Sequence, residues 1–188
     1  LVIVLKTIGY FRIFCYRHLL SDNHPKLSDA KLNQAVQFVG KGQINIGSTV
    51  IGVWPSPYLL SDTCYIEARS LGAEVSIGNG TSLSNGATVI ADKTKVVIGD
   101  RCLIGARLFI CDSDFHGLDL ESRTNGIYQC SPVTVGDDVF IGQDVKILKG
   151  VSIGDGAVIG SGSIVTKDVE NHSIYAGNPA RFIRSLKP

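Results

Sequence analysis

The sequence predicts an all-β solenoid built as a parallel β-helix. In the second half of the chain an aliphatic residue recurs at every sixth position: Val135, Ile141, Ile147, Ile153, Ile159 and Val165. Valine, alanine or serine stands two positions before each of them, and glycine directly follows several. A period of six is typical of a strand and a turn used three times per coil of a parallel β-helix. Six matches in phase disfavour the alternative, a set of ordinary buried strands.

In such a coil each aliphatic side chain points into the prism and stacks on its equivalent one coil away, at roughly 4.8 Å. We expect the glycine after the aliphatic residue to let the backbone turn without a Cβ clash. One coil takes about eighteen residues, and it buries its apolar face only against its neighbours. The repeat therefore has to be stacked to be stable.

Length and composition limit the class of protein. The 188 residues predict one domain with small terminal attachments. The balance of 18 basic and 17 acidic residues argues against a nucleic-acid partner. The 5 cysteines include no C-x-x-C pair, so we expect neither a disulfide framework nor a metal site. They indicate a reduced, cytoplasmic protein.

Residues 1–39 are expected to form a helical N-terminal segment. Residues 1–20 are apolar with Lys6, Arg12 and Arg17 interspersed, which predicts a helix too charged to span a membrane well. Such a helix could cover the open end of the β-helix, or it could lie on a membrane surface. We favour the cap and keep peripheral contact with the inner face of a membrane, through residues 1–20, as the alternative.

The β-helix is expected to span residues 40–169. Its first stack begins weakly, and the phase is then carried by further aliphatic residues: Ile46, Leu71, Ile77, Leu83, Val89, Ile98, Ile104 and Ile110. The six-residue beat is absent from residues 112–132, which predicts a loop extruded on one face. Residues 170–188 are expected to form a loop and a short C-terminal helix.

The extruded loop carries the candidate catalytic residue. His116 is the histidine within the predicted β-helix body, and an imidazole titrates near neutrality, which suits a general base. The neighbouring carboxylates of Asp112, Asp114 and Asp119 could orient the ring. On the position of the loop alone, a solvated histidine and a catalytic one are equally good interpretations.

Three motifs in the C-terminal half carry a resemblance to a known family: ILKGV at 147–151, GSGSIVTKD at 160–168 and AGNPA at 176–180. Together with the hexad repeat they resemble the hexapeptide-repeat acyltransferases, in the branch of maltose, galactoside and polysaccharide O-acetyltransferases. The resemblance covers residues 40–186. It implies a left-handed parallel β-helix, a homotrimer with active sites between subunits, and acetyl-CoA as the acyl donor.

The resemblance also implies roles for single residues. The family's catalytic histidine matches His116, and the asparagine that holds the acceptor matches Asn85, whose alternative role is that of a turn residue in an Asn-Gly pair. Asp114 is expected beside the acceptor, as is Phe140, which stands where many relatives carry tryptophan. The positions that match the donor site are Gln143, Ser161, Thr166, Lys167, Arg181 and Arg184. Their cations would meet the phosphates of coenzyme A.

These expectations describe an acetyl-CoA-dependent O-acetyltransferase that modifies a sugar hydroxyl, in the setting of surface polysaccharide biosynthesis. An N-acetyltransferase of an amino sugar or a nucleotide-linked amino sugar would use the same scaffold and donor. A γ-type carbonic anhydrase shares the β-helix but needs three zinc-binding histidines, and only His116 lies suitably. A non-catalytic trimeric scaffold is the remaining alternative.

Overall fold

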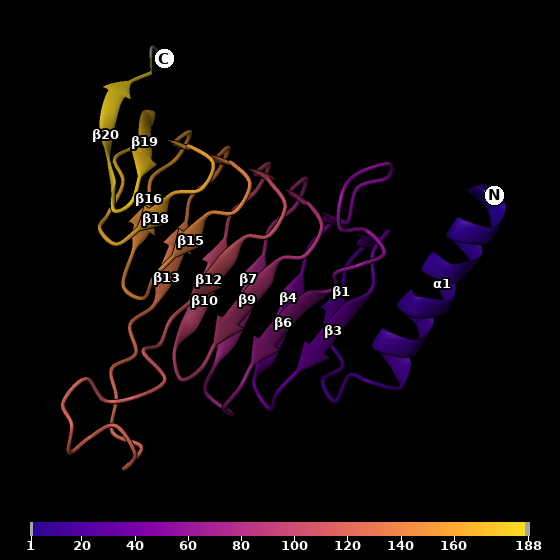
Figure 1. Ribbon diagram of the computed structural model, residues 1–188, viewed down its shortest axis with the longest axis horizontal. Helices are drawn as coiled ribbons and strands as arrows, with labels where there is room; N and C mark the ends of the chain where they lie inside the picture. The colour runs from indigo at the N-terminus through magenta and orange to yellow at the C-terminus, as the bar shows by residue number, and fades with distance from the viewer. Residues whose placement is uncertain (1, 187–188) are drawn as a thin grey trace.

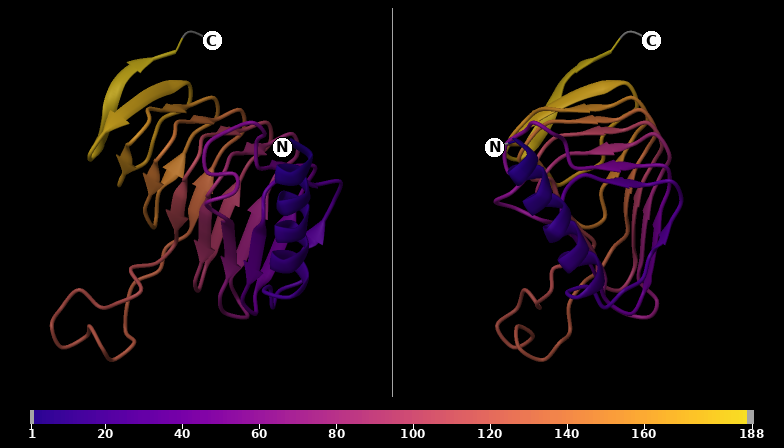
Figure 2. Two further views of the ribbon diagram at one scale, coloured as in Figure 1. Left: turned by 45° about the vertical axis from the view of Figure 1, so that its right-hand side comes forward. Right: turned by 90° about the vertical axis from the view of Figure 1, so that its right-hand side faces the viewer.

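The chain winds into a prism with three walls, each of which is a β-sheet (Figures 1 and 2). The computed structural model describes residues 2–186, so Leu1, Lys187 and Pro188 lie outside the described residues. Within each wall the strands of successive coils pair in parallel. This arrangement is the parallel β-helix that the hexad repeat predicts.

Each coil contributes one short strand to each wall. Sheet A contains β1 (Lys26–Leu27), β4 (Gln43–Ile46), β7 (Glu74–Ile77), β10 (Lys95–Ile98), β13 (Val133–Val135) and β16 (Ser152–Ile153). Sheet B contains β2 (Lys31–Leu32), β5 (Val50–Ile51), β8 (Ser82–Leu83), β11 (Leu103–Ile104), β14 (Phe140–Ile141), β17 (Val158–Ile159), β19 (Ser173–Gly177) and β20 (Ala180–Ser185). Sheet C contains β3 (Val36–Val39), β6 (Cys64–Ala68), β9 (Thr88–Ala91), β12 (Phe109–Cys111), β15 (Lys146–Ile147) and β18 (Ile164–Val165).

The aliphatic residues of the repeat stack in register along the three walls. The paired positions are Ile77, Ile98, Val135 and Ile153 in sheet A, Leu83, Ile104, Ile141 and Ile159 in sheet B, and Val89, Ile110, Ile147 and Val165 in sheet C. All of them are buried in one hydrophobic core. Because burying one such side chain contributes about 1.5–3 kcal/mol, these columns are the main stabilising element of the fold.

Leu71 was assigned to the repeat by its spacing, and this assignment is wrong. Its side chain is 82% exposed in the turn between β6 and β7. The core position in that coil belongs to Ile66, which pairs with Val89 in sheet C. Strand β6 is longer than the two-residue strands of the regular coils, so the turn after it shifts the phase of the repeat.

Glycines that follow the aliphatic residues allow neighbouring coils to approach closely. A Cβ built on Gly99 would lie 2.4 Å from a carboxylate oxygen of Asp137, one coil away. The same oxygen accepts a hydrogen bond from the N–H of Asp100 at 2.8 Å, and Asp155 accepts one from the N–H of Asp137 at 2.8 Å. The left-handed backbone occurs later in the turn, for example at Asp138 with φ 57°. Close contact between coils, rather than turning, therefore requires glycine at position 99.

The C-terminal segment forms a hairpin instead of the short helix expected from the sequence. Strand β19 pairs in parallel with β17, and β20 turns back antiparallel to β19 (Figure 1). The rings of Tyr175 and Phe182 meet edge to face across the hairpin, with centroids 5.7 Å apart. The free edge of β17 offers unpaired backbone groups, and pairing with them favours an extended chain over a helix.

The parallel sheets begin at Lys26 and not near Gly40, because β1, β2 and β3 form a first coil. Helix α1 (Val2–His18) precedes this coil and packs against β3 and the loop at residues 52–63. Figure 2 shows α1 at the N-terminal end of the prism. The sequence predicts α1 as a helix but does not predict the strands of residues 26–39. Their paired core positions, Leu27, Leu32 and Phe38, are unevenly spaced, so they do not continue the period of six.

Candidate active site

The loop at residues 112–132 leaves the prism after β12 and returns at β13, through a short antiparallel neck (Figure 1). Ser113 and Cys130 form a bridge across the neck. The N–H of Asp114 donates to the carbonyl of Gln129 at 3.1 Å, and the N–H of Ser131 donates to that of Asp112 at 2.8 Å. The neck therefore fixes where the loop starts, while its tip stands away from the walls.

Two cation–π contacts hold the neck against sheet C. The guanidinium of Arg69 lies 4.9 Å from the ring centroid of Phe115, and the ammonium of Lys93 lies 3.6 Å from that of Tyr128. Such contacts contribute about 0.5–1 kcal/mol each at exposed sites. Both aromatic rings belong to the loop and both cations to the prism, so the contacts orient the loop relative to the coils.

Buried carboxylates lie behind these cations. Glu67 accepts hydrogen bonds from Arg69 at 2.8 Å and from the hydroxyl of Tyr65 at 3.0 Å. Asp92 accepts one from the hydroxyl of Ser113 at 2.8 Å and lies 3.7 Å from Arg69. Burial, together with the charge of Glu67, raises the pKa of Tyr65 to about 12. Sequence reasoning missed this cluster, although Glu67 inside a strand of buried residues was a signal that could have revealed it.

His116 lies on the exposed part of the loop, and its ring is held by the backbone. The Nδ1 atom is 3.0 Å from the carbonyl oxygen of Arg123. Because a carbonyl oxygen only accepts, this hydrogen bond requires the proton on Nδ1, and the neutral ring then keeps a lone pair on Nε2. Among the described residues Nε2 has no hydrogen-bond partner. The loop thus presents one imidazole nitrogen that is able to take a proton.

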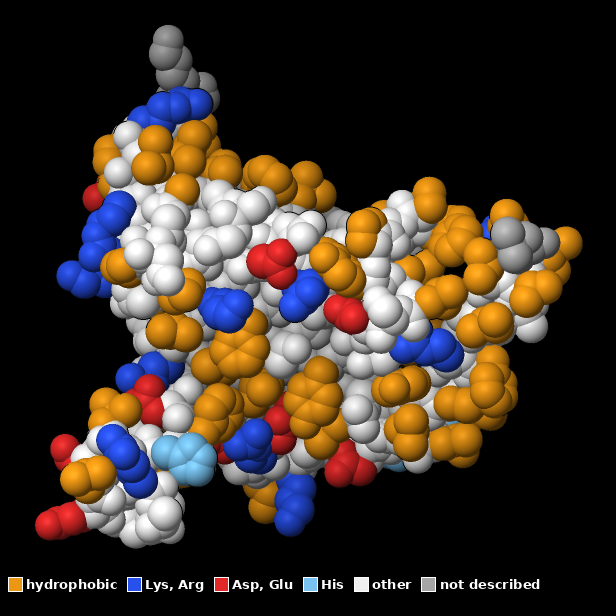
Figure 3. Space-filling model, viewed as in Figure 1, with side chains coloured by type: hydrophobic (Ala, Val, Ile, Leu, Met, Phe, Trp, Pro, Cys, Tyr) orange, Lys and Arg blue, Asp and Glu red, His pale blue; other side chains and the backbone are white. Residues whose placement is uncertain are grey.

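A hollow of about 230 Å³ lies within the loop beside this imidazole. Its lining includes Asp114, His116, Leu118, Ile127, Tyr128 and Gln129. The space-filling view shows the loop as a separate lobe below the prism (Figure 3). The lining combines apolar side chains with a few polar groups, which is the usual composition of a small-ligand site.

Two of the three aspartates expected to orient His116, Asp112 and Asp114, make other contacts, and the third, Asp119, lines the hollow beside the ring. Both oxygens of Asp112 are buried and accept hydrogen bonds from the turn of the previous coil, including the N–H groups of Asp92 at 2.7 Å and Thr94 at 2.7 Å. Asp114 lines the hollow, but its Oδ2 faces the ammonium of Lys149 at 3.2 Å. The carbonyl of Arg123, which no residue type could reveal, holds the ring instead.

Asn85 is completely buried beneath the loop at residues 52–63, away from any surface. Its amide Nδ2 donates to the carbonyls of Pro57 at 2.7 Å and Val53 at 3.2 Å. Its Oδ1 accepts the N–H of Val53 at 3.0 Å. With both polar atoms used in this way, the expected contact with an acceptor sugar is not available in this conformation, and the residue acts as an anchor of the loop.

The expected donor residues lie along the C-terminal coils. Gln143 and Ser161 occupy equivalent turns of neighbouring coils, and the N–H of Gln143 donates to Ser161 Oγ at 3.2 Å. Thr166 and Lys167 follow β18, while Arg181 and Arg184 are exposed on β20. Phe140 is half exposed on sheet B. None of these side chains lines the hollow beside His116 in the single chain.

Within residues 2–186 no group of three or more histidine, cysteine or acidic side chains is placed to hold a metal ion. The five cysteines are all free. Burial raises the pKa of the Cys64 thiol to about 11, and burial also raises the pKa of Cys130 at the loop neck. Neither thiol is therefore an activated nucleophile. His116 is left as the side chain in this region best suited to proton transfer.

Comparisons with known proteins identify the class to which this prism of hexads belongs. The family model for bacterial transferase hexapeptide, six repeats, matches residues 132–167. The model for the hexapeptide repeat of succinyl-transferase matches residues 95–110. The chain belongs to the hexapeptide-repeat acyltransferases.

Individual relatives extend this finding. Galactoside O-acetyltransferase of Escherichia coli K12 is 40% identical over 117 residues, which are 62% of this chain and 57% of that protein. The crystal structure of the polySia specific acetyltransferase NeuO matches with a TM-score of 0.70 at 32% identity, covering 87% of this chain and 67% of that one. A galactoside acetyltransferase in complex with coenzyme A matches with a TM-score of 0.58 at 26% identity, covering 97% and 80%. The chain spans about half the length of the first curated relatives it matches.

Proposed function

We propose that this protein is an acetyl-CoA-dependent O-acetyltransferase that modifies a sugar hydroxyl, with His116 as general base. The observation that carries the proposal is the 3.0 Å contact between His116 Nδ1 and the carbonyl of Arg123. It leaves Nε2 as the proton acceptor, in a loop whose neck is fixed by hydrogen bonds and cation–π contacts. The unpaired Nε2 and the fixed neck support the proposed role as general base.

The proposed reaction is a direct transfer. His116 Nε2 takes the proton of the sugar hydroxyl while its oxygen attacks the carbonyl carbon of the thioester. A backbone N–H of a neighbouring coil stabilises the oxyanion of the tetrahedral intermediate. The carbon–sulfur bond then breaks, and the coenzyme A thiolate takes the proton from the imidazolium. The products are an acetyl ester and a free thiol, and His116 returns to its neutral form. Holding both substrates in one cleft supplies much of the rate enhancement.

We place the donor along the C-terminal coils, near Gln143, Ser161, Thr166 and Lys167. Gln143 and Ser161 stand at equivalent turns of neighbouring coils, and the backbone N–H of Gln143 donates to Ser161 Oγ at 3.2 Å. We propose that this continuous polar strip binds the pantetheine arm. The guanidinium groups of Arg181 and Arg184 are the cations proposed to meet the phosphates. A relative of the same fold has coenzyme A bound.

We propose a homotrimer with active sites between subunits, because His116 and the donor residues do not meet within one chain. The outward column of sheet B begins with Lys31, Val50 and Ser82 and is apolar over its last four coils, at Leu103, Phe140, Val158 and Ile174. The outward column of sheet A consists of Lys26, Asn45, Ser76, Val97, Thr134 and Ser152. Leu103 is 58% exposed, and exposed apolar groups of this kind mark protein interfaces. We expect the solenoid to be left-handed, as the family resemblance implies.

The subunit arrangement has a matched test. Leu103→Glu should dissociate the trimer, because it buries a charge in an apolar contact. Val97→Glu, in the preceding wall of the same coil, should leave it intact. Light scattering coupled to gel filtration measures the mass of each variant. A monomeric wild type, or equal masses for the wild type and the Leu103 variant, would refute the proposed interface.

The acceptor is proposed to be a sugar of a surface polysaccharide or its precursor, acetylated in the cytoplasm where free cysteines persist. The test is a thiol-release assay with acetyl-CoA and a panel of sugars, amino sugars, nucleotide sugars and oligosaccharides. Stimulated release of thiol by hydroxyl acceptors, with an ester product identified by mass spectrometry, is the expected result. An amide product from amino sugars would instead establish an N-acetyltransferase. No acceptor-dependent release with any of them, from intact trimer, would favour a non-catalytic scaffold.

A further inference from the structure

Helix α1 contacts the prism through one face only. The residues of this inner face are Leu5, Gly9, Arg12, Ile13 and Tyr16, which follow helical spacing and are partly buried. Arg12 fastens the helix by donating to the carbonyls of Leu60 and Asp62 in the loop at residues 52–63. No residue of α1 is fully buried. The opposite face of the helix is therefore left for solvent or a partner.

That opposite face is apolar as well. Ile3, Phe11 and Phe14 stand at positions i, i+8 and i+11, so they form one ridge, and their exposed fractions run from 55% to 80%. Tyr10, which is 70% exposed, stands at the edge of this ridge, next to the prism. Helices at the surface of soluble domains normally carry polar residues on their outer face. Figure 3 shows hydrophobic side chains gathered over the end of the molecule that holds α1. Within the described residues nothing covers this ridge.

The charges of α1 have a single sign. The helix contains Lys6, Arg12, Arg17 and His18 and no aspartate or glutamate. Lys6 and Arg17 are i and i+11, so they lie together on one flank of the ridge, and neither has an ion-pair partner among the described residues. An apolar ridge flanked by cations is the pattern of a helix that lies in the interface of an anionic membrane.

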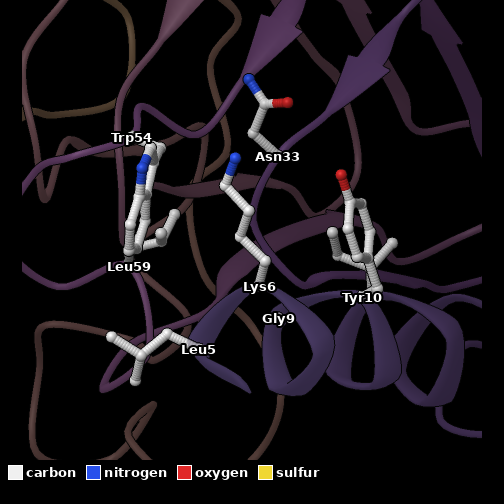
Figure 4. A pocket seen from close by; sticks show the side chains of 8 residues that line it. Leu5, Lys6, Gly9, Tyr10, Asn33, Trp54 and Leu59 are labelled. Atoms are coloured by element: carbon white, nitrogen blue, oxygen red, sulfur yellow. The ribbon is translucent and has the colours of Figure 1, made fainter. Parts of the chain in front are cut away.

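A hollow of about 240 Å³ opens on the same flank, between α1 and the loop at residues 52–63. Figure 4 shows the side chain of Lys6 reaching up between Trp54 and Tyr10, toward Asn33. The side chains of Leu5 and Leu59 line the apolar side of this hollow. Tryptophan and tyrosine are the side chains enriched at the headgroup level of membranes, and the ammonium of Lys6 provides a cation for a phosphate there.

We propose that α1 docks this protein on the surface of an anionic phospholipid bilayer, with the ridge in the acyl boundary and a headgroup phosphate in the hollow beside Lys6. In this proposal the helix lies in the plane of the surface. Among residues 2–186 no helix is both long enough and apolar enough to cross a bilayer. A second copy of the chain is a poorer occupant. An antiparallel two-fold contact between ridges would bring the Lys6 and Arg17 flanks of two helices together, and like charges repel.

Sedimentation with vesicles tests the docking. The wild type should bind vesicles that contain phosphatidylglycerol, bind phosphatidylcholine vesicles at least tenfold less, and be released by salt. Ile3→Glu/Phe11→Glu should lower the partition coefficient at least tenfold, because it places charges in the acyl boundary. Leu71→Glu, which alters an equally exposed leucine on a turn of the prism, is the control and should bind as the wild type does.

Substitutions that remove one positive charge measure the electrostatic contribution to vesicle binding. Lys6→Gln should weaken binding to the anionic vesicles about fivefold, the factor for one cation near the surface. Lys95→Gln, on sheet A, should leave binding unchanged. Two results would overturn the proposal: no preference of the wild type for anionic vesicles, or unchanged binding of the Ile3/Phe11 variant. A wild type that ignores vesicles but loses mass on gel filtration when Ile3 and Phe11 are replaced would show that the ridge is a protein interface.

Discussion

The loop at residues 52–63 and the loop at residues 112–132 interrupt the same solenoid, but the prism holds them differently. Buried side chains grip the first loop along its length: Asn85 binds the backbone of Val53 and Pro57, and Gln34 donates to the carbonyls of Tyr58 at 2.8 Å and Asp62 at 3.2 Å. The second loop is held at its neck, and its tip stands clear of the walls (Figure 2).

The difference indicates which loop is suited to a structural role and which to the proposed chemical one. A loop whose backbone groups are satisfied by buried amides has one conformation, and its anchors contribute to stability. A loop fixed only at its neck can present a side chain to a substrate or to another subunit, as His116 is presented. The family resemblance assigned roles in the acceptor site to both Asn85 and His116. The structure separates the two residues. Asn85 lies under the loop at residues 52–63, called here the closed loop, and His116 lies on the loop at residues 112–132, called the open loop.

The largest effect is expected at the open loop. His116→Ala should lower kcat by about two to four orders of magnitude, because the hydroxyl nucleophile loses its base. The melting temperature and the mass in solution should stay at the wild-type values, since the side chain is exposed. Steady-state thiol release, calorimetry and light scattering measure the three quantities. Turnover of the variant at the wild-type rate would remove His116 from the mechanism.

Thiol labelling of Cys64 tests whether the closed loop stays shut. Cys64 lies behind the closed loop, donates to Gln34 at 3.1 Å, and has a pKa raised to about 11 by burial. At pH 8 its thiolate fraction is therefore low, and we expect maleimide labelling about a hundredfold slower than that of a free peptide thiol. The rate should rise tenfold per pH unit below pH 11, while the protein stays folded. Rapid labelling of Cys64 at pH 8, located by mass spectrometry, would mean that the closed loop opens readily.

Removing an anchor of the closed loop should cost stability. Asn85→Ala removes the partner of the partly buried hydrogen bonds to the backbone of Val53 and Pro57, and we expect a loss of about 1–3 kcal/mol in the free energy of unfolding. Asn125→Ala is the matched variant in the open loop, where the exposed asparagine also bonds to nearby backbone. It should change stability by less than about 0.5 kcal/mol. Chemical denaturation measures both, and equal losses would contradict the distinction between the loops.

The smallest effect is expected at the neck. Lys93→Met removes the cation over the ring of Tyr128 and keeps most of the aliphatic stem. A contact of about 1 kcal/mol corresponds to a fall of about fivefold in kcat/KM if the neck positions the loop for catalysis. Lys95→Met, two residues along on sheet A, is the control. A kcat/KM for Lys93→Met equal to that of Lys95→Met would show that the loop keeps its position without this contact.

Several features were predictable because they depend on local pattern. The hexad spacing predicted the parallel β-helix, since only inward-facing aliphatic residues stacked between coils satisfy a period of six. The absence of that pattern in residues 112–132 predicted the extruded loop. The apolar run at the N-terminus predicted α1, although the sequence could not show that one face would stay uncovered.

Other features depended on contacts between distant parts of the chain. The C-terminal segment became a hairpin because β17 offered a free edge. The first coil formed although its core positions, Leu27, Leu32 and Phe38, are too unevenly spaced to show a period. Asn85 and His116 are both polar residues near turns, and their sequence neighbourhoods do not reveal which will be covered. The sequence by itself determined the winding of the coils, because core side chains repeat with the backbone. Tertiary structure alone decided which polar side chains are buried as anchors and which are presented, because burial depends on how a loop packs against other coils.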